Sequence, residues 1–317
     1  MEDPRYLASN DVAPSPLMDQ LVAEQRGRTD QRQNLIKEIQ DKLMHTYNLK
    51  DAKLITYITN FAMPNSQIQQ PDISPIEDML SKIKKTENLF MIIDSPGGDS
   101  DIAQKIIRMC RNRSENFYTV VPSSAKSAAT MICLGSDKIF MGYLSELGPI
   151  DPQIQTPQGY WVSAKFFKEA YEKYANDMRS AGTVGPYPEA VMLSQLPPAV
   201  LELCERATKR TMKYTREWLE KYMLRKRFKD DQDKLREVSK FAKDTAEKLC
   251  DVEEWLLHSS GIDAHTAQTD LNLVIEELRP DDPIWMKIWE LYVLSERQLQ
   301  LASRTKLFES EFISMHR

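Results

Sequence analysis

The sequence predicts an α/β fold built around a parallel sheet, followed by a mainly helical region. Leu89–Asp94 is a short, continuously apolar run, which is typical of a strand buried on both faces of a parallel sheet. Eight of the ten glycines fall between Gly97 and Gly185, so tight turns concentrate in the middle of the chain. Strand and helix patterns alternate through the same stretch, which favours right-handed crossover connections.

The individual elements follow from local periodicity. Apolar residues recur at helical spacing from Thr29 onward and predict a helix there. The β-branched and aromatic segment Lys53–Phe61 predicts a strand, and a helix begins behind Ser74 and Pro75. The remaining core elements expected are the strand Leu89–Asp94, a helix over 102–110, the strand Phe117–Val121, the helix Ala128–Leu134 and the strand Lys138–Met141.

Beyond Trp161 the pattern is helical almost to the end. The sequence therefore predicts three parts: an N-terminal arm and helix over residues 1–50, an α/β core over 51–198, and a helical region over 199–317. The boundary is expected at Pro197–Pro198, because consecutive prolines cannot continue a helix.

Composition excludes several classes of protein. The net charge of −5 leaves no basic excess for a nucleic-acid backbone. The cationic run within residues 200–228 is interpreted as a solvated amphipathic helix, with nucleic-acid binding as the alternative. No apolar run approaches the ~20 residues of a membrane-spanning helix, and the N-terminus lacks the apolar core of a secretory signal. Four widely spaced cysteines then predict reduced thiols and a cytoplasmic location.

Two strand-to-helix turns carry the residues that could perform chemistry. The first is Ser95-Pro96-Gly97-Gly98, where paired glycines leave the backbone amides at a helix N-terminus free of obstruction. The second contains Ser127, which is followed by two alanines and an apolar helix. Each turn alone has a structural interpretation, a tight connection for the first and an N-cap for the second.

Together the two turns fit acyl transfer, which needs a hydroxyl nucleophile, a base and two amides aimed at the oxyanion. Ser127 is the candidate nucleophile, and the Gly98 and Ala128 amides are the candidate donors. No histidine occurs between residues 46 and 257, so a lysine kept neutral by burial becomes the candidate base. Lys165 and Lys168, which follow the Gly-Pro-Ile-Asp-Pro-Gln turn, are favoured over Lys126 because adjacent side chains diverge.

Three segments carry a family resemblance. SPGGDSDIAQKI resembles the Ser-Pro-Gly-Gly turn of the ClpP/crotonase superfamily. AKSAATMICLGSDKIFMGYLSELGPIDPQ resembles the nucleophile segment of its signal-peptide-peptidase-A-like branch, most closely that of the serine dehydrogenase proteinase family. HSSGIDAHTAQTDLNL is similar to the histidine-containing element that follows the core in that family. The resemblance covers roughly residues 50–275.

The resemblance implies a ClpP/crotonase-like ββα superhelix with serine endopeptidase activity and a polypeptide substrate. It assigns Ser127 as the nucleophile and Gly98 and Ala128 as the oxyanion donors, and relatives in this branch use a Ser–Lys dyad. It also implies a homo-oligomer, expected as a trimer-based or larger ring. The sequence departs from its usual relatives in carrying Asp94 before the turn and no N-terminal membrane segment.

Other constellations point away from metals and cofactors. Cys250, His258 and His265 lack zinc-site spacing, and His258 is expected to cap or pack. Asp151 is expected to close its loop, with stabilisation of a lysine ammonium as the alternative. We therefore expect no cofactor and no metal.

Two further hypotheses remain open. The first is an acyl-CoA enzyme of the crotonase type, with Asp94 or Asp151 as a carboxylate base. The second is a catalytically silent oligomeric scaffold on the same fold.

Overall fold

The computed structural model describes residues 16–83, 85–155, 161–180, 190–191, 198–251, 255 and 257–317. In chain order the elements are α1 (Pro16–Tyr47), β1 (Lys53–Thr59), η2 (Gln70–Asp72), α2 (Ile73–Lys82), β2 (Thr86–Asp94), α3 (Ser100–Arg113), β3 (Ser114–Val121), β4 (Ser124–Ala125), α4 (Ala128–Leu134), β5 (Lys138–Gly142), β6 (Glu146–Leu147), β7 (Gln153–Gln155), β8 (Trp161–Ser163), α5 (Ala164–Ser180), α7 (Pro198–Trp218), the π-helical turn η3 (Leu219–Met223), α8 (Leu224–Arg227), α9 (Gln232–Leu249), α11 (Ala264–Thr269), β9 (Ile275–Leu278), α12 (Pro283–Leu301), β10 (Lys306–Ser310) and β11 (Ser314–His316).

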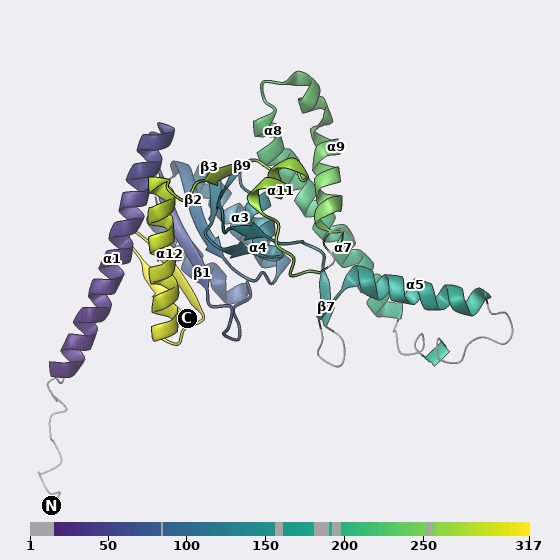
Figure 1. Ribbon diagram of the computed structural model, residues 1–317, viewed down its shortest axis with the longest axis horizontal. Helices are drawn as coiled ribbons and strands as arrows, with labels where there is room; N and C mark the ends of the chain where they lie inside the picture. Colours follow the sequence, from purple (N-terminus) through teal and green to yellow (C-terminus); the bar gives the residue numbers. More distant parts are fainter. Residues whose placement is uncertain are drawn as a thin grey trace, which may run out of the picture.

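A seven-stranded sheet forms the centre of the molecule (Figure 1), with the strand order β11-β10-β1-β2-β3-β5-β9. The strands from β1 to β9 in this order run parallel, whereas β10 is antiparallel to β1 and β11 is antiparallel to β10. Met91 of β2 lies opposite Ile55 of β1 and Thr119 of β3. The apolar run of β2 is buried on both faces of the sheet, as the sequence predicts.

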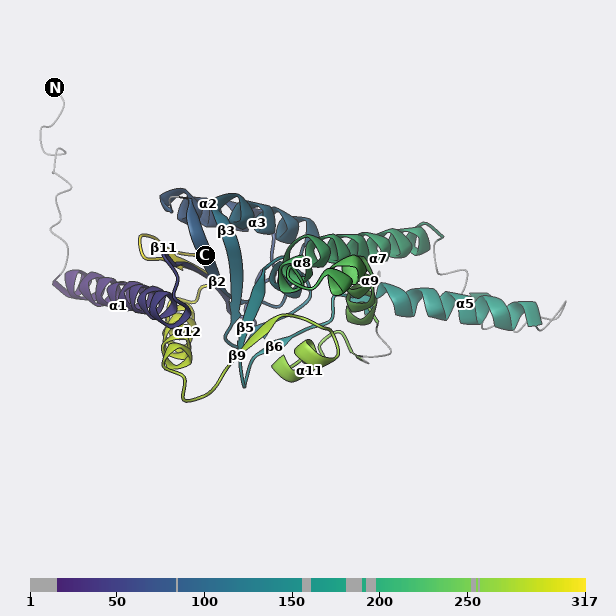
Figure 2. The ribbon, with the colours of Figure 1, turned by 90° about the horizontal axis from the view of Figure 1, so that it is seen from above.

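Helices cover both faces of this sheet. Seen from above, α2 and α3 lie on one side and α1 and α12 on the other (Figure 2). The first side buries Ile106 of α3 and Ile132 of α4 against the sheet. The second side buries Ile39 of α1 and Ile288 of α12. Two apolar cores therefore hold the sheet rigid, and the loops after its strands are built on this support.

The region after residue 198 differs from its expected helical character, because it also supplies β9, β10 and β11 to the central sheet. These strands are short and lie between longer helices, so their alternation was hidden in the dominant helical pattern. The N-terminal helix also starts earlier than expected, at Pro16 rather than Thr29. The start of the expected arm, residues 1–15, and residues 192–197 beside the expected boundary lie outside the described residues.

Helices α5, α7 and α9 form a lateral extension. Figure 1 shows α5 pointing away from the sheet, while α7 leads back toward α4. α7 packs against α5, α9 and α4. Within the described ranges, no helix combines the length and the hydropathy that a membrane crossing requires.

Candidate active site

The two turns singled out in the sequence lie against each other. Ser95 donates its backbone N–H to the Ser124 carbonyl at 3.0 Å, and the Lys126 N–H donates to the Ser95 carbonyl at 3.0 Å. A side chain at Gly97 would bring its Cβ within 2.7 Å of Ser127 Cβ and 2.6 Å of the Lys126 carbonyl oxygen. Gly97 also has φ +97°, so glycine is required there for both space and backbone conformation.

Ser127 has a strained backbone at the entrance to α4. Its φ is +50° and its ψ is −116°, a combination that residues other than glycine rarely adopt. The residue precedes α4, but its side chain makes no capping hydrogen bond. The N-cap interpretation of this serine is therefore not supported. A strained turn that displays a half-buried hydroxyl is the arrangement found at many nucleophiles.

The two amides expected as oxyanion donors lie in the two facing turns. Ala128 is the first residue of α4, so its N–H lies in the first turn, where helical amides have no intrahelical acceptor. Gly98 has φ +141° in the facing turn, just before α3. Among the described residues, neither amide has a hydrogen-bond acceptor. Both residues border the same cavity as Ser127.

The Gly97–Gly98 turn is held from its other side by residues 66–72. Ile68 donates its N–H to the Gly97 carbonyl at 2.6 Å and accepts from the Asp99 N–H at 2.9 Å. Lys306 of β10 fixes this segment with its ammonium, 2.6 Å from the Gln67 carbonyl and 2.8 Å from the buried Asp72 carboxylate. Desolvation lowers the pKa of Lys306, while the Asp72 carboxylate opposes that shift.

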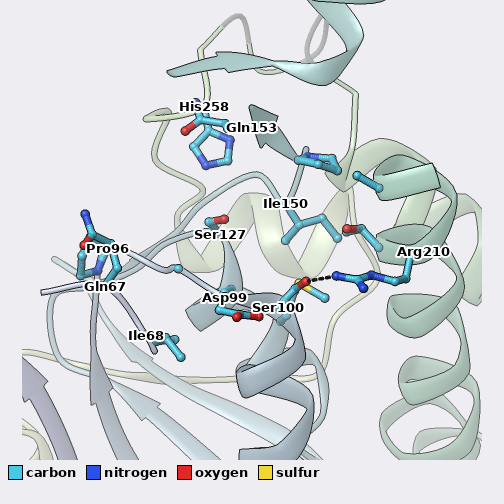
Figure 3. Close-up of a pocket in the computed structure, with 16 residues that line it drawn as sticks. Gln67, Ile68, Pro96, Asp99, Ser100, Ser127, Ile150, Gln153, Arg210 and His258 are labelled. Atoms are coloured by element: carbon cyan, nitrogen blue, oxygen red, sulfur yellow. Dashed lines mark hydrogen bonds between the residues drawn. The ribbon is translucent and has the colours of Figure 1, made fainter. Parts of the chain in front are cut away.

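A cavity of about 640 Å³ opens above Ser127 (Figure 3). Its floor is formed by the two turns, and one wall by Arg210 and its neighbours on α7. Arg210 Nη1 pairs with Asp101 at 3.1 Å. The complete lining is Gln67, Ile68, Pro96, Gly98, Asp99, Ser100, Ser127, Ala128, Met131, Ile150, Pro152, Gln153, Ala207, Arg210, Thr211 and His258.

The histidine that borders this cavity is paired with a buried carboxylate. His258 Nδ1 lies 2.7 Å from Asp151 Oδ1, and the two side chains are 20% and 2% exposed. An ionised carboxylate can only accept, so Nδ1 donates in this contact, and in a neutral imidazole Nε2 would then carry the lone pair. Figure 3 shows His258 and Ser127 on the lining of one cavity. No direct hydrogen bond joins the two side chains in the described part of the chain; such bonds are often long before substrate binds.

Comparisons with known proteins identify the family of this chain. A model of the ClpP-like SDH-type serine proteinases matches residues 20–183, which is about half of the chain. The chain belongs to this family. The resemblance and the ClpP-like α/β fold expected from the sequence are thereby confirmed.

Two individual relatives match parts of this SDH-type proteinase. Two uncharacterized proteins of Methanocaldococcus jannaschii are 34% identical over 107 residues and 28% identical over 104 residues. These matches cover 33% and 32% of this chain, and they span 36% and 34% of the relatives.

Two solved structures of a membrane-bound stomatin-specific protease were also compared. The first, in complex with a substrate peptide, has a TM-score of 0.41 and 15% identity over 74% of this chain and 76% of that one. The second has a TM-score of 0.29 and 20% identity over 41% and 61%. Scores this low support no conclusion about this proteinase.

The lysines expected as candidate bases border a neighbouring cavity, which shares Pro152 with the cavity above Ser127 and is also lined by Asp151. Lys165 and Lys168 border a second cavity, of about 340 Å³, and neither lines the cavity above Ser127. Lys165 Nζ is 2.8 Å from Asp251 Oδ1, and Lys168 Nζ is 3.4 Å from Glu205 Oε1. Both lysines lie on α5, which points away from the sheet (Figure 1).

The sequence predicts a capping or packing role for His258 and a loop-closing role for Asp151. Their pairing joins the loop after β6 to the loop after α9, at a sequence separation of 107 residues. The only sequence signal was the histidine-containing segment of the family resemblance. The α7 wall with Arg210 had no sequence signal.

Asp94, the departure noted before the Ser-Pro-Gly-Gly turn, lies beneath the site. Its side chain is 2% exposed and accepts from the Ser124 N–H at 2.9 Å. Burial raises the pKa of Asp94 to about 7, and Glu296 adds to the rise, whereas hydrogen bonds from Ser124 and Tyr292 lower it. Asp94 does not line the cavity above Ser127.

This carboxyl should make stability depend on pH. The pKa of Asp94 is higher in the folded protein than in the unfolded chain. The contribution of this group to the free energy of unfolding is therefore fully present below about pH 4 and is lost as the pH rises through about 7. We expect Asp94→Asn to unfold at a higher temperature than wild type at pH 8. The free-energy gain is bounded by about 1.4 kcal/mol for each unit of pKa shift and should vanish near pH 4. Thermal unfolding at several pH values tests this. A difference in unfolding temperature between the two proteins that stays the same from pH 4 to pH 8 would contradict it.

Proposed function

We propose that this SDH-type proteinase cleaves polypeptides through an acyl-enzyme on Ser127, with His258 as the general base and Asp151 as its orienting carboxylate. The observation that carries the proposal is the 2.7 Å contact between His258 Nδ1 and Asp151 Oδ1 at the edge of the Ser127 cavity. A histidine that is held by a buried carboxylate and borders the same cavity as a strained serine fits the residue set of a serine hydrolase.

In the proposed acylation step, Ser127 Oγ attacks the carbonyl carbon of the scissile peptide bond while Nε2 of His258 takes the hydroxyl proton. The Gly98 and Ala128 amides donate to the oxyanion that forms. Collapse of the tetrahedral intermediate breaks the C–N bond, and His258 returns the proton to the leaving amine. Water then attacks the ester carbonyl with His258 again as base, which releases the carboxylic acid and restores Ser127.

The Ser–Lys dyad expected from the resemblance has less support. A general base must reach the nucleophile directly or through one water. Lys165 and Lys168 border another cavity and each pairs with a carboxylate, whereas His258 borders the cavity of Ser127. A thioester enzyme with a carboxylate base also has less support, because Asp94 lies outside the cavity lining and Asp151 Oδ1 is engaged by His258.

Cytoplasmic location and ring assembly stay predictions. Assembly is supported by α5, which projects from the body (Figure 1) and exposes 40% of Phe166. Ala164 is the sole residue of α5 that is buried, so the helix offers apolar surface to another copy. Native mass spectrometry at micromolar concentration measures the assembly, and a monomer would contradict it.

A fluorophosphonate probe tests the proposed function directly. We expect the wild-type proteinase to gain one phosphonyl group, and peptide mapping to locate it on Ser127. Ser127→Ala should gain none and should lose cleavage of an unfolded protein substrate. The matched control is Ser123→Ala, which removes a hydroxyl from the preceding segment and should be labelled like wild type. Equal labelling of Ser127→Ala would remove Ser127 from the mechanism.

A further inference from the structure

The described part of the loop that carries His258 is hydrogen-bonded to β6 and to the segment of the nucleophile. Leu147 of β6 exchanges two backbone hydrogen bonds with Ile262, both at 2.9 Å. Between His258 and Ile262, the Ser260 carbonyl oxygen lies 3.3 Å from Lys126 Nζ. Lys126 is the residue immediately before Ser127. One side chain thus links the segment of the nucleophile to the loop of the histidine.

The surroundings of Lys126 Nζ make it a hydrogen-bond donor. Glu146 Oε1 lies at 2.6 Å, and the carbonyl oxygens of Leu147 and Ser260 each lie at 3.3 Å. An ammonium has three protons and no acceptor, which matches these three oxygens. The side chain is 13% exposed, so the contacts form where water competes little.

The backbone of Lys126 is fixed as firmly as its side chain. Its N–H donates to the Ser95 carbonyl at 3.0 Å, and its carbonyl accepts from the Ala129 N–H at 2.9 Å. Glu146, the carboxylate beside the amine, also accepts from the Ser124 hydroxyl at 3.0 Å. The network therefore connects the first turn, the nucleophile segment, β6 and the histidine loop.

Two glycines supply the space that this network occupies. A Cβ at Gly148 would lie 2.7 Å from Lys126 Cδ, and a Cβ at Gly261 would lie 2.0 Å from Glu146 Oε2. Neither glycine has a positive φ, so space and not backbone conformation is what these positions provide.

We propose that Lys126 is a positioning residue, which holds the His258 loop over Ser127 by donating to the Ser260 carbonyl while Glu146 balances its charge. This inference rests on the proposed function for its catalytic consequence, but the placement of His258 is measurable without activity. Misplacement of a catalytic group by the order of 1 Å costs about 10²-fold in rate. Loss of Lys126 should therefore lower turnover while the fold persists.

The direct test observes His258 itself. The chain has only four histidines, so its imidazole ¹H–¹⁵N signals are few and His258→Ala assigns the one of interest. We expect Lys126→Met to shift or broaden the His258 signal, and Lys126→Arg to restore it in part. The matched control is Lys138→Met, which removes another amine–carboxylate pair, with Glu276 at 2.7 Å, between β5 and β9. An unchanged His258 signal in Lys126→Met, or an equal change in Lys138→Met, would overturn the inference.

A double-mutant cycle tests the catalytic consequence. We expect Lys126→Met to lower kcat for a peptide substrate by about 10²-fold with a smaller change in KM. The same substitution in a His258→Ala background should cost less than about threefold, because residues that act as a unit are not additive. Equal losses in both backgrounds would show that Lys126 does not act through His258. If His258→Ala alone causes a large loss in the same assay, the proposed function stands and only the role of Lys126 is contradicted.

A second variant covers the case in which Lys126→Met does not fold. Gly148→Ala leaves Lys126 in place but forces its side chain away from the network, since the new Cβ would lie 2.7 Å from Cδ. We expect it to reproduce the His258 shift and the loss of kcat. Gly27→Ala is its control, because a Cβ there meets nothing within 4 Å. Wild-type spectra and turnover in Gly148→Ala would count against the proposed role.

Discussion

We expect His258→Ala to lower kcat/KM for a peptide substrate by about 10⁴-fold or more. The imidazole is the base in the proposed mechanism, and without it the Ser127 hydroxyl must lose its proton to water. Lys165→Ala and Lys168→Ala should each stay within about threefold of wild type, because their amines pair with carboxylates beside another cavity. Steady-state kinetics near neutral pH measure all three variants.

The control for this prediction is another histidine of the same region. His265 lies exposed on α11 and does not line the cavity, so His265→Ala should keep wild-type turnover. Thermal unfolding of each variant separates loss of the base from loss of the fold. If His258→Ala retained turnover while Lys165→Ala or Lys168→Ala lost it, the Ser–Lys dyad would replace the histidine mechanism.

We expect Asp151→Ala to lower kcat by about 10⁴-fold, with little change in KM. In the proposed mechanism, the carboxylate accepts from Nδ1 of His258 and stabilises the imidazolium that would form during attack. Asp151→Asn should lose less than Asp151→Ala, because no described group donates to Asp151 Oδ2. The amide carbonyl of asparagine is therefore free to accept from Nδ1, and only the charge is lost.

The comparison of these two substitutions separates orientation from charge. Asp251→Asn is the control, since this carboxylate pairs with Lys165 and does not line the Ser127 cavity. Pre-steady-state kinetics with an ester substrate would show the defect in acylation. A loss of less than tenfold in Asp151→Ala would mean that His258 is oriented by other contacts, or that it is not the base.

The core of the fold could be predicted from the sequence because its signals are local. The apolar run ending at Asp94, the helix Ala128–Leu134 and the glycines at 97 and 98 each depend on neighbours along the chain. The meeting of the two turns was predictable as well, because parallel strands place their carboxyl ends at one edge of a sheet. The structure brings Gly98, Ser127 and Ala128 to one cavity there.

The base could not be predicted in the same way. The absence of histidine between residues 46 and 257 is a fact of the sequence, but it does not tell which distant histidine the fold returns to the site. His258 reaches Asp151 only because the loop after α9 pairs with β6 through Ile262. Contacts of this kind depend on tertiary packing, which periodicity does not report. The strands β9 and β10 were missed for the same reason.

Strands that follow the site in the sequence complete both edges of the sheet, β9 at one edge and β10 with β11 at the other. Translation proceeds from the N-terminus, so Ser127 leaves the ribosome long before residues 258–316 exist. A nascent chain that has released only the first half has neither the proposed base nor a closed sheet. In the proposed mechanism, Ser127 can therefore act as a nucleophile only after the segment that carries His258 has also been synthesised and has folded back onto the sheet.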